Sequence, residues 1–327
     1  MSLIESEIAS LFDEMSDEYD QITDLWYSWL FSNLHFRISK DLLSTDPGTG
    51  GKCLDIGCGT GFQAILFGLA GIQTQGIDIS PALLEVARKK AAASYLQKPF
   101  FPAPYPFVKD LHAKTIDNIN AFRQGRAVQV PEYRIASAID LPFHDGAFRY
   151  VNCIGSVLSF LGDYRAGLSE MARVLEPEGY FFLEFENKYN PDLIWALLDS
   201  AIGGKIGYDQ SFKESCRNLF SRPSRHLQIE FPFSKQEETI YMPIWIFNTG
   251  RIIREMREYN LEVLDIRSLH SVTNFIPSVL LDTPSPSKRL VSVFKALSKV
   301  EKILSPIYPF SRLGCSTYIF GRKRPGP

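Results

Sequence analysis

Apolar residues recur along this chain in two alternating patterns, short continuous runs and longer segments with helical spacing. The short runs predict buried strands, and the longer segments predict helices that each cover an apolar face. The predicted strands span residues 53–56, 74–78, 134–138, 150–155, 180–186, 261–269 and 316–322. A first helical pattern begins at residue 4, and the further predicted helices span 25–43, 62–70, 80–96, 108–122, 165–175, 249–259 and 288–304. Strands that alternate with helices in this way predict an α/β fold.

A glycine-rich turn joins the first predicted strand to the helix that follows it. Gly57, Gly59 and Gly61 occupy alternate positions of this turn. Glycine lets backbone N–H groups approach a ligand closely, and strand–turn–helix units of this kind commonly bind nucleotides. The dinucleotide fingerprint G-x-G-x-x-G needs a glycine where this chain has Phe62. The turn therefore favours a nucleotide ligand over a dinucleotide, with a tight turn that binds nothing as the alternative.

Three sequence motifs resemble one enzyme family. The string Asp55-Ile-Gly-Cys-Gly-Thr-Gly61 resembles the first motif of the class I S-adenosylmethionine-dependent methyltransferases. Residues 173–184 (Arg-Val-Leu-Glu-Pro-Glu-Gly-Tyr-Phe-Phe-Leu-Glu) resemble a later motif of that family. Residues 12–20 resemble a segment found ahead of the core in small-molecule methyltransferases of the type 11 group, including those of quinone biosynthesis. The match covers about residues 50–185 in the family's order.

This resemblance implies a fold, a cofactor and a set of binding residues. The fold would be a Rossmann-like, seven-stranded, mostly parallel sheet with helices on both faces and an antiparallel last strand. The cofactor would be S-adenosyl-L-methionine, with S-adenosyl-L-homocysteine as its product. The resemblance places Asp78 on the ribose hydroxyls, although a role as a helix cap is the alternative, and Asp140 on the adenine amino group. The predicted cofactor-binding residues are Asp55, Gly57, Cys58, Gly59, Gly61, Asp78, Ile79, Asp140, Leu141 and Gly155.

The predicted reaction is an in-line displacement that needs alignment and, for some acceptors, a base. Ser156 and Ser159 stand where many relatives carry an Asn-x-x-His-like pattern, so an obvious general base is absent there. The catalytic candidates are Tyr19, Glu186 at the end of a strand, and His270 after the sixth predicted strand. A histidine can deprotonate a phenol or an enol near neutral pH. A structural role for His270 is the alternative.

Three segments, 99–131, 187–239 and 270–312, fall outside the minimal fold and are predicted to be insertions. They are rich in Phe, Tyr, Trp and Pro, which predicts a partly enclosed apolar pocket and a small or lipophilic acceptor. The predicted organisation is a helical cap over 1–48, a cofactor-binding core over 49–186, an inserted substrate lid over 187–240, and the rest of the core over 241–327.

Two charged features lie within these insertions. A group of basic residues can hold an anionic part of a substrate or simply face solvent; it consists of Arg217, Arg222, Arg225 and His226. The helix at 288–304 has apolar residues near helical spacing and lysines opposite them. Such a helix predicts either peripheral membrane contact or a lid that packs on the core.

Composition excludes several function classes. The formal net charge is −2, so no nucleic-acid partner is expected. The five cysteines form no C-x-x-C pair, which predicts no metal site and a reduced cytoplasmic setting. The acidic N-terminus lacks the basic region of a secretory signal. The oligomeric state stays open.

The overall prediction is a methyltransferase that acts on a small or lipophilic metabolite. One alternative is a protein with this fold that does not methylate, such as a pericyclase or a binding subunit. A protein or RNA methyltransferase is a second alternative. A nicotinamide oxidoreductase is a third, and Phe62 argues against it.

Overall fold

A computed structural model gives the arrangement of most of the chain. The structure describes residues 3–21, 23–45, 51–93, 104–222, 225–235, 238–283 and 285–325. Each of the three predicted insertions is partly outside this set. The segments concerned are 99–103 in the first insertion, 223–224 and 236–237 in the second, and 284 in the third.

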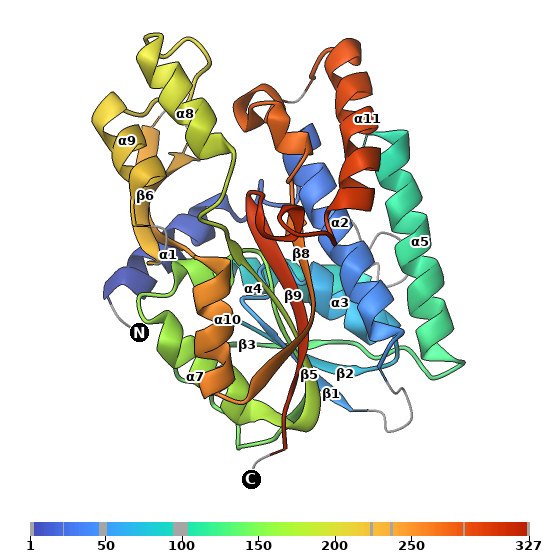
Figure 1. Cartoon of the computed structure of the whole chain (residues 1–327). Coiled ribbons are helices and arrows are strands. Elements are labelled where there is room, and N and C mark those ends of the chain that lie inside the picture. Colours follow the sequence, from blue (N-terminus) through green and yellow to red (C-terminus); the bar gives the residue numbers. More distant parts are fainter. Residues whose placement is uncertain are drawn as a thin grey trace.

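A mixed sheet of seven strands forms the centre of the molecule (Figure 1). The spatial order of the strands is β3-β2-β1-β4-β5-β9-β8. All neighbouring pairs are parallel except those of β9, which runs antiparallel to β5 and to β8. The predicted sheet is therefore confirmed, with its antiparallel last strand. The strands are β1 (Lys52–Ile56), β2 (Gln73–Asp78), β3 (Glu132–Ile135), β4 (Phe148–Cys153), β5 (Leu175–Glu186), β8 (Leu261–Leu269) and β9 (Ser316–Lys323).

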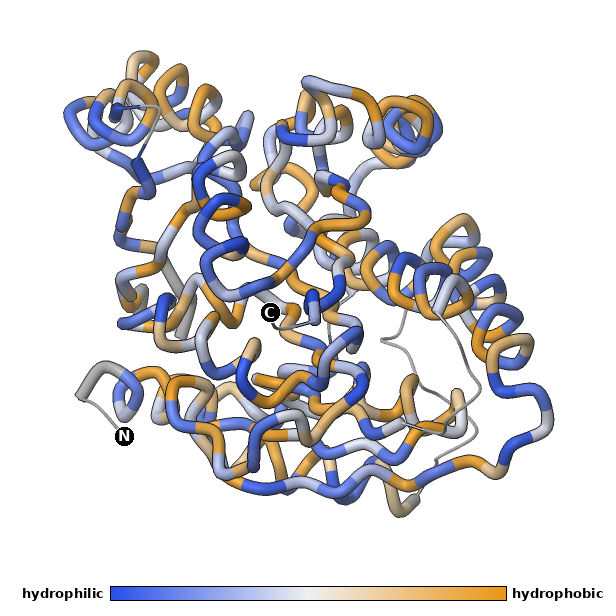
Figure 2. Tube along the Cα trace, turned by 60° about the horizontal axis from the view of Figure 1, so that its bottom comes forward, coloured by the Kyte–Doolittle hydropathy of each residue, from blue (hydrophilic) through white to orange (hydrophobic). Residues whose placement is uncertain are grey.

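Helices cover both faces of this sheet, as Figure 1 shows. On one face, α2, α3 and α5 enclose a core that includes Leu34, Phe67 and Phe182. On the other face, α7 and α10 enclose a core that includes Leu168 and Met256. Hydrophobic and hydrophilic positions alternate along the helical parts of the chain (Figure 2). An amphipathic helix of this kind packs its apolar side against the core. The helices are α2 (Leu25–Leu42), α3 (Phe62–Leu69), α4 (Pro81–Ala93), α5 (Pro106–Arg123), α7 (Tyr164–Val174) and α10 (Thr249–Glu258).

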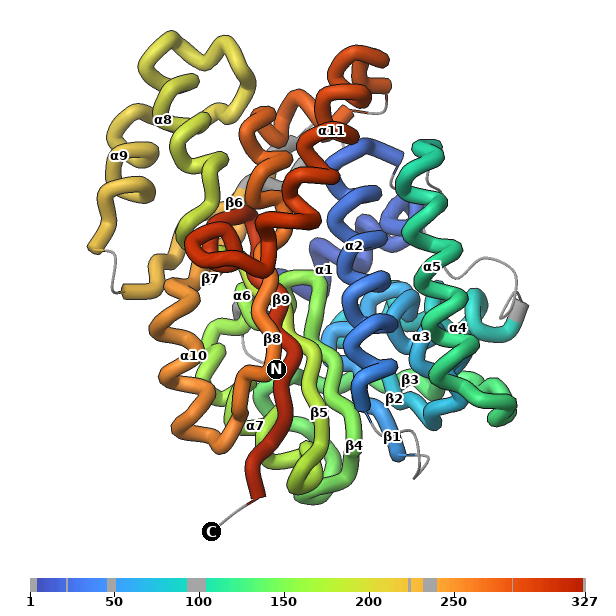
Figure 3. The backbone as a smooth tube through the Cα atoms, turned by 45° about the vertical axis from the view of Figure 1, so that its right-hand side comes forward, coloured from blue at the N-terminus to red at the C-terminus, as the bar shows by residue number. Residues whose placement is uncertain are grey.

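Further elements lie beyond the carboxyl ends of the strands, mostly toward the top of Figures 1 and 3. The second insertion contains two helices and one strand of a two-stranded antiparallel hairpin, β6–β7, which the sequence pattern did not predict. The third insertion contains a long helix, as predicted. These elements are α1 (Leu3–Met15), α6 (Val157–Phe160), α8 (Asp192–Ala201), α9 (Phe212–Phe220), β6 (Leu227–Lys235), β7 (Glu238–Ile246), η1 (Thr273–Phe275), η2 (Ser278–Leu280), α11 (Lys288–Leu304) and η3 (Phe310–Arg312).

The aromatic helix α2 is buried on two sides. Its second half packs on the sheet through Leu34 and Ile38, whereas Trp26 and Trp29 in its first half pack against α5, α11 and the segment before α11. Helix α2 therefore joins the core of the sheet to the C-terminal insertion. This double contact explains why the segment is dense in large apolar side chains.

Several predicted strand boundaries differ from the structure, and the largest differences are at the end of β3 and the start of β5. Strand β3 ends at Ile135 instead of Ala138, because the chain then turns back through a bridge between Ser137 and Asp140. Strand β5 starts at Leu175, inside the predicted turn, because Leu175 pairs with Phe148 before a shift of register.

Candidate functional site

A pocket lies at the carboxyl ends of β1, β2 and β4, where the order of a doubly wound sheet reverses. Ligands of open α/β sheets bind at this position. Gly59 and Gly155 line the pocket from the turns after β1 and β4, with φ values of 50° and 80°. A Cβ atom on Gly155 would meet no atom within 4 Å, and one on Gly59 would meet only Tyr19, at 3.8 Å. A side chain at either position would therefore occupy the pocket itself.

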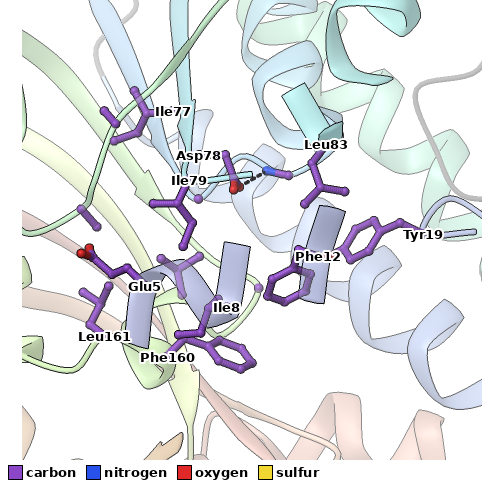
Figure 4. A pocket seen from close by; sticks show the side chains of 16 residues that line it. Glu5, Ile8, Phe12, Tyr19, Ile77, Asp78, Ile79, Leu83, Phe160 and Leu161 are labelled. Atoms are coloured by element: carbon purple, nitrogen blue, oxygen red, sulfur yellow. Dashed lines mark hydrogen bonds between the residues drawn. The ribbon is translucent and has the colours of Figure 1, made fainter. Parts of the chain in front are cut away.

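Asp78 ends β2 and lines this pocket. Its Oδ2 accepts the N–H of Gly59 at 2.8 Å, drawn as the dashed line in Figure 4. Its Oδ1 accepts the N–H of Ser80 at 2.9 Å. These two bonds fix the carboxylate between the glycine turn and the start of α4. Burial raises the pKa of Asp78, while the two N–H donors lower it. Each oxygen retains a further lone pair for a ligand hydroxyl.

Asp55 lies beneath the glycine turn and does not line the pocket. Its Oδ1 accepts Asn152 Nδ2 from β4 at 2.7 Å. Burial raises the pKa of Asp55 to about 7. One buried acceptor next to the turn, Asn152 Oδ1, receives no hydrogen bond from any described residue. Such atoms are uncommon in a folded core and indicate room for a donor.

Helix α1 closes the pocket, a contact that the sequence indicated only through the motif at 12–20. Ile8 and Phe12 point into the pocket together with Glu5 (Figure 4). Glu5 is 6% exposed, and its carboxylate accepts the hydroxyl of Ser137. Positions 5, 8 and 12 share one helical face, and this spacing was the available signal. The pocket that remains encloses about 90 Å³.

A second set of bonds ties the N-terminal segment to the core. Asp13 Oδ1 accepts the hydroxyl of Ser80 at 2.5 Å and the N–H of Ala82 at 3.0 Å. Both donors belong to the start of α4, so Asp13 caps that helix from a distant part of the chain. The carboxylate of Asp20 likewise accepts the hydroxyl of Thr60 and Lys90 Nζ, both at 2.6 Å.

The predicted candidate Tyr19 lines this same pocket, beside Gly59. Burial, followed by the negative charges of Asp78 and Asp20, raises the pKa of its hydroxyl. The hydroxyl therefore keeps its proton at neutral pH and is a hydrogen-bond donor, not a base. Ile79 also lines this pocket, as predicted.

Besides Asp55, four of the predicted cofactor-binding residues do not line this pocket. Two of them, Asp140 and Leu141, are directed elsewhere by the turn after β3. Asp140 is exposed and outside the pocket, because the tight turn from Ser137 reverses the chain. Leu141 is buried in the core under α7. Ala136 and Ala138 line the pocket in their place.

The remaining two positions belong to the glycine turn itself. The side chain of Cys58 packs inward beneath Gly76, so only the backbone of this residue belongs to the turn. Gly61 lies against Tyr133, where a Cβ atom would collide with the ring. Gly57 does line the pocket, as predicted.

Ser156 connects this pocket to the predicted candidate Glu186. The hydroxyl of Ser156 donates to Glu186 Oε1 at 2.7 Å, and its N–H donates to Glu184 Oε2 at 2.6 Å. The N–H of Glu186 in turn donates to Ser159 Oγ at 2.9 Å. Burial, then repulsion from Glu184, raises the pKa of Glu186 to about 8. The two serines that replace the expected Asn-x-x-His pattern thus orient a carboxyl group.

A second and larger cavity, here called the upper cavity, begins at Glu186. It encloses about 600 Å³. Trp26 and Tyr27 of α2 line it on one side, and α8, α9 and the β6–β7 hairpin line the other. The aromatic lining agrees with the prediction, but the cavity is more acidic than the aromatic insertions led us to expect. The carboxylates that line it are Glu186, Asp192, Asp209, Glu214, Glu230 and Asp282.

His270 lines neither of these two cavities, which corrects its prediction as a catalyst. The imidazole is fully buried and stacks on Trp26 with ring centroids 3.6 Å apart. Its Nδ1 lies 2.9 Å from Thr273 Oγ1, and its Nε2 lies 3.3 Å from the carbonyl oxygen of Trp26. Burial lowers its pKa to about 3, so the ring is neutral and serves packing.

The predicted basic patch is divided in the structure, because Arg225 and His226 line a separate small pocket together with Arg251. Arg217 lines the upper cavity. His226 is buried and lies 3.1 Å from Glu255, which also binds Arg165 and Arg251. Burial lowers the pKa of His226, so its neutral ring donates a hydrogen bond to Glu255, whereas Arg165 and Arg251 form the ion pairs with that carboxylate.

The fold and this pocket agree with a comparison of the chain with protein-family models. Residues 33–266 match the model described as a methyltransferase domain. The chain therefore belongs to this methyltransferase family, which confirms the resemblance and implies S-adenosyl-L-methionine as the cofactor.

Curated relatives and solved structures give more specific similarities. The chain is 30% identical to a 2-phytyl-1,4-naphtoquinone methyltransferase of Trichormus variabilis over 53% of this chain and 61% of that protein. It is 29% identical to a demethylmenaquinone methyltransferase of Symbiobacterium thermophilum over 54% of this chain and 58% of that protein. The chain thus spans about three fifths of the length of these relatives. The crystal structure of the [4+2]-cyclase SpnF shares the fold, with a TM-score of 0.53 at 16% identity over 98% of this chain and 97% of that one.

The helices within the described ranges are short or polar. Each of them lacks the length or the apolar character that crossing a bilayer requires.

Proposed function

We propose that this protein transfers a methyl group from S-adenosyl-L-methionine to a small molecule held in the upper cavity. The observation that carries the proposal is the junction of two cavities. Gly155 lines the pocket beside the glycine turn, the next residue is Ser156, and its hydroxyl binds Glu186, which lines the upper cavity. A cofactor on one side and an acceptor on the other would meet at this point.

The residues of the pocket fit the cofactor. Its methionine part would lie along Gly57 and Gly59, with the unpaired Oδ1 of Asn152 beneath the turn. Its ribose hydroxyls would bind Asp78, which already faces the pocket. When bound, the cofactor supplies an activated methyl carbon next to a positively charged sulfur.

The part of the pocket proposed for adenine is apolar. Ile79, Ala136, Ala138 and Leu161 line this part. Apolar walls suit a purine ring, which would pack between them. Glu5, already bound to Ser137 nearby, is the polar residue best placed to recognise its edge.

The chain's own residues would then align and deprotonate the acceptor. Glu186 is the proposed proton acceptor, because its raised pKa of about 8 lies close to neutral pH, where a general base works best. Ser156 and Ser159 hold its orientation. Tyr19, with its proton retained, would donate a hydrogen bond at the cofactor side.

Helix α1 would have to move for the cofactor to enter. Pockets for ligands of this size are typically about 300–1,000 Å³, whereas the closed pocket encloses about 90 Å³. Two side chains of α1, Glu5 and Asp13, bond it to Ser137 and to the start of α4. We therefore expect the segment 3–21 to open and close over the cofactor.

The acceptor, the compartment and the partners belong to this proposal as well. The two curated relatives are named for quinone substrates, which supports a small-molecule acceptor here. A cytoplasmic setting is supported by the five cysteines, all of them free. Peripheral membrane contact through α11 stays a prediction; its apolar residues Val293, Val300 and Ile303 are exposed.

The test has two stages. Calorimetric titration with S-adenosyl-L-homocysteine, with NAD as the control ligand, measures the cofactor site directly. The protein is then incubated with methyl-labelled S-adenosyl-L-methionine and a cell extract separated into small-molecule, lipid, protein and nucleic-acid fractions. Label in the first two fractions supports the proposal.

Three results would contradict it. A preference for NAD would overturn the cofactor assignment. Label confined to protein or RNA would replace the small-molecule acceptor by a polymer. Tight cofactor binding without any label would favour a non-methylating protein; SpnF, named as a [4+2]-cyclase, is a protein of the same fold.

A further inference from the structure

The upper cavity has an excess of negative charge. Among the described residues that line it, six are carboxylates, and Arg217 is the single cationic side chain. None of the six forms an ion pair with a cation in the described part of the chain. Asp209, Glu214, Glu230 and Asp282 are exposed toward solvent, whereas Glu186 and Asp192 lie deeper. A lining with more carboxylates than cations favours a cationic ligand.

The inner carboxylates are held in place by neutral groups. Asp192 Oδ1 accepts the hydroxyl of Tyr208 and the N–H of Ser278, the latter at 3.1 Å. Glu186 accepts the hydroxyl of Ser156. These donors orient the two carboxylates but supply no positive charge. Burial raises the pKa of Asp192 as well as that of Glu186, so a cation that entered the cavity would stabilise their ionised forms.

Two amide oxygens that lack a hydrogen-bond donor in the described part of the chain also line the upper cavity. Asn218 lies on α9, lines the cavity and is 4% exposed, and its Oδ1 accepts no hydrogen bond from a described residue. Gln210 lines the same cavity, and its Oε1 is likewise without a donor among the described residues. Buried acceptors of this kind cost stability unless a ligand supplies the missing donor.

Aromatic rings complete the lining. Trp26, Tyr27, Phe231 and Tyr241 contribute to the walls, and the indole of Trp26 is fixed by its stacking on His270. Aromatic faces attract organic cations as well as apolar groups. Carboxylates, unpaired amide oxygens and aromatic rings together match a protonated amine, which has a positive charge and several N–H donors. They do not match a carboxylate or a phosphate.

We propose that the upper cavity recognises a small organic molecule that carries a protonated amine. Its ammonium group would lie among Glu186, Asp192 and Asp282, and its carbon skeleton would contact Trp26 and Tyr27. This inference rests on the proposed function in one respect, namely that the amine-containing molecule is the methyl acceptor. Binding of the amine itself can be measured whether or not methyl transfer occurs.

The test uses matched probes that differ in one functional group. The first set is naphthalen-1-ylmethylamine, 1-naphthalenemethanol and 1-naphthoate; the second is phenethylamine, 2-phenylethanol and 3-phenylpropionate. Each is titrated calorimetrically into the full-length protein, alone and saturated with S-adenosyl-L-homocysteine. One charge-assisted contact is worth about tenfold in affinity, so we expect each amine that binds to exceed its alcohol by about that factor and the acids to be weaker still.

Variants locate the binding site. Asp192→Asn and Asp282→Asn should each lower the affinity for the amines about fivefold to tenfold without changing that for S-adenosyl-L-homocysteine. Asp282 is exposed at the edge of the cavity, so its variant should fold normally. Asp117→Asn, on the exposed side of α5, makes the same change of net charge elsewhere and should change nothing.

The results separate this inference from the proposed function. If the alcohols bind within about twofold of the amines, or if neither amine binds, the inference is overturned. Equal loss of affinity in Asp117→Asn would also overturn it, because the effect would then be one of net charge. Failure of S-adenosyl-L-homocysteine to bind, with the amine preference intact, would defeat the proposed function and leave the cavity's specificity standing.

Discussion

The two cavities of this protein are built in different ways. The cofactor-side pocket, which is lined by the glycine turn and by Asp78, lies where three parallel strands end. Helix α1 covers it and leaves about 90 Å³. The upper cavity encloses about 600 Å³ and is walled mainly by elements outside the sheet. The first follows from the topology of the sheet, and the second from the insertions. In the proposed function, recognition of the cofactor and of the acceptor would therefore depend on separate parts of the chain, joined at Ser156 and Glu186.

The largest effect should come from filling the cofactor-side pocket. Gly155→Ala places a methyl group where no atom lies within 4 Å, so the fold tolerates it but the ligand does not. We expect the affinity for S-adenosyl-L-homocysteine to fall about 100-fold, as judged by calorimetry, with unchanged amine binding in the upper cavity.

Gly125→Ala is the matched control for this change. Gly125 has φ of 81°, next to 80° for Gly155, and its Cβ would also meet nothing within 4 Å, but it lies in the turn after α5. Both substitutions should cost about 1–2 kcal/mol of stability through left-handed backbone strain. Equal affinities for the cofactor product in the two variants would show that Gly155 does not border the cofactor.

Asp78→Asn should give the next largest effect. The amide keeps one acceptor for the N–H groups of Gly59 and Ser80 but loses the charge and the second acceptor that would bind ribose hydroxyls. We expect about a tenfold to 100-fold loss of affinity for S-adenosyl-L-homocysteine by calorimetry. Asp282→Asn removes a carboxylate from the upper cavity and should leave this affinity unchanged. The comparison of the cavities fails if both variants weaken both ligands alike.

Asp13→Ala tests whether α1 is held over the pocket by its cap on α4. The N–H of Ala82 loses its acceptor, so we expect a loss of about 0.5–2 kcal/mol in the free energy of unfolding. Hydrogen exchange of residues 3–21 should become faster, and addition of S-adenosyl-L-homocysteine should slow it again. Asp17→Ala, on an exposed position of the same segment, is the control. Unchanged exchange in Asp13→Ala would mean that apolar contacts alone hold α1.

The smallest effect concerns the junction and its dependence on pH. The pKa of Glu186 is raised to about 8 in the folded state from 4.5, so the folded protein binds more protons than the unfolded one between these pH values. Stability therefore falls as pH rises through this window. Glu186→Gln removes that contribution and should stabilise the protein relative to wild type more at pH 8 than at pH 5, by a few degrees in Tm. A constant difference in Tm across this range would contradict the raised pKa.

Sequence patterns predicted much of the fold because most elements carry a local signal. The strand Leu261–Leu269 and the helix Lys288–Leu304 have the predicted bounds, since each has an uninterrupted period and clear flanking turns. Gly57, Gly59 and Asp78 line one pocket, because their positions relative to consecutive strands fix where they meet in a parallel sheet. Their binding of the cofactor stays a prediction. The β6–β7 hairpin was missed because Pro232 and Pro243 weaken the strand pattern.

Contacts between distant segments could not be predicted in this way. The turn from Ser137 to Asp140 leaves Asp140 exposed to solvent, although its motif suggested the pocket. His270 looked available for catalysis, and only the packing of Trp26 from a helix 244 positions earlier makes it a neutral core residue.

The sequence by itself determined most strands and helices and the glycine turn, because these depend on local periodicity. Its resemblance to a family indicated the mostly parallel sheet with an antiparallel last strand. Only the tertiary structure decided what surrounds the turn. It brought Glu5 and Asp13 over the pocket, paired Ser156 with Glu186, and gathered carboxylates from separate insertions into one cavity. The physical reason is that burial, pKa and charge balance depend on neighbours that are remote along the chain.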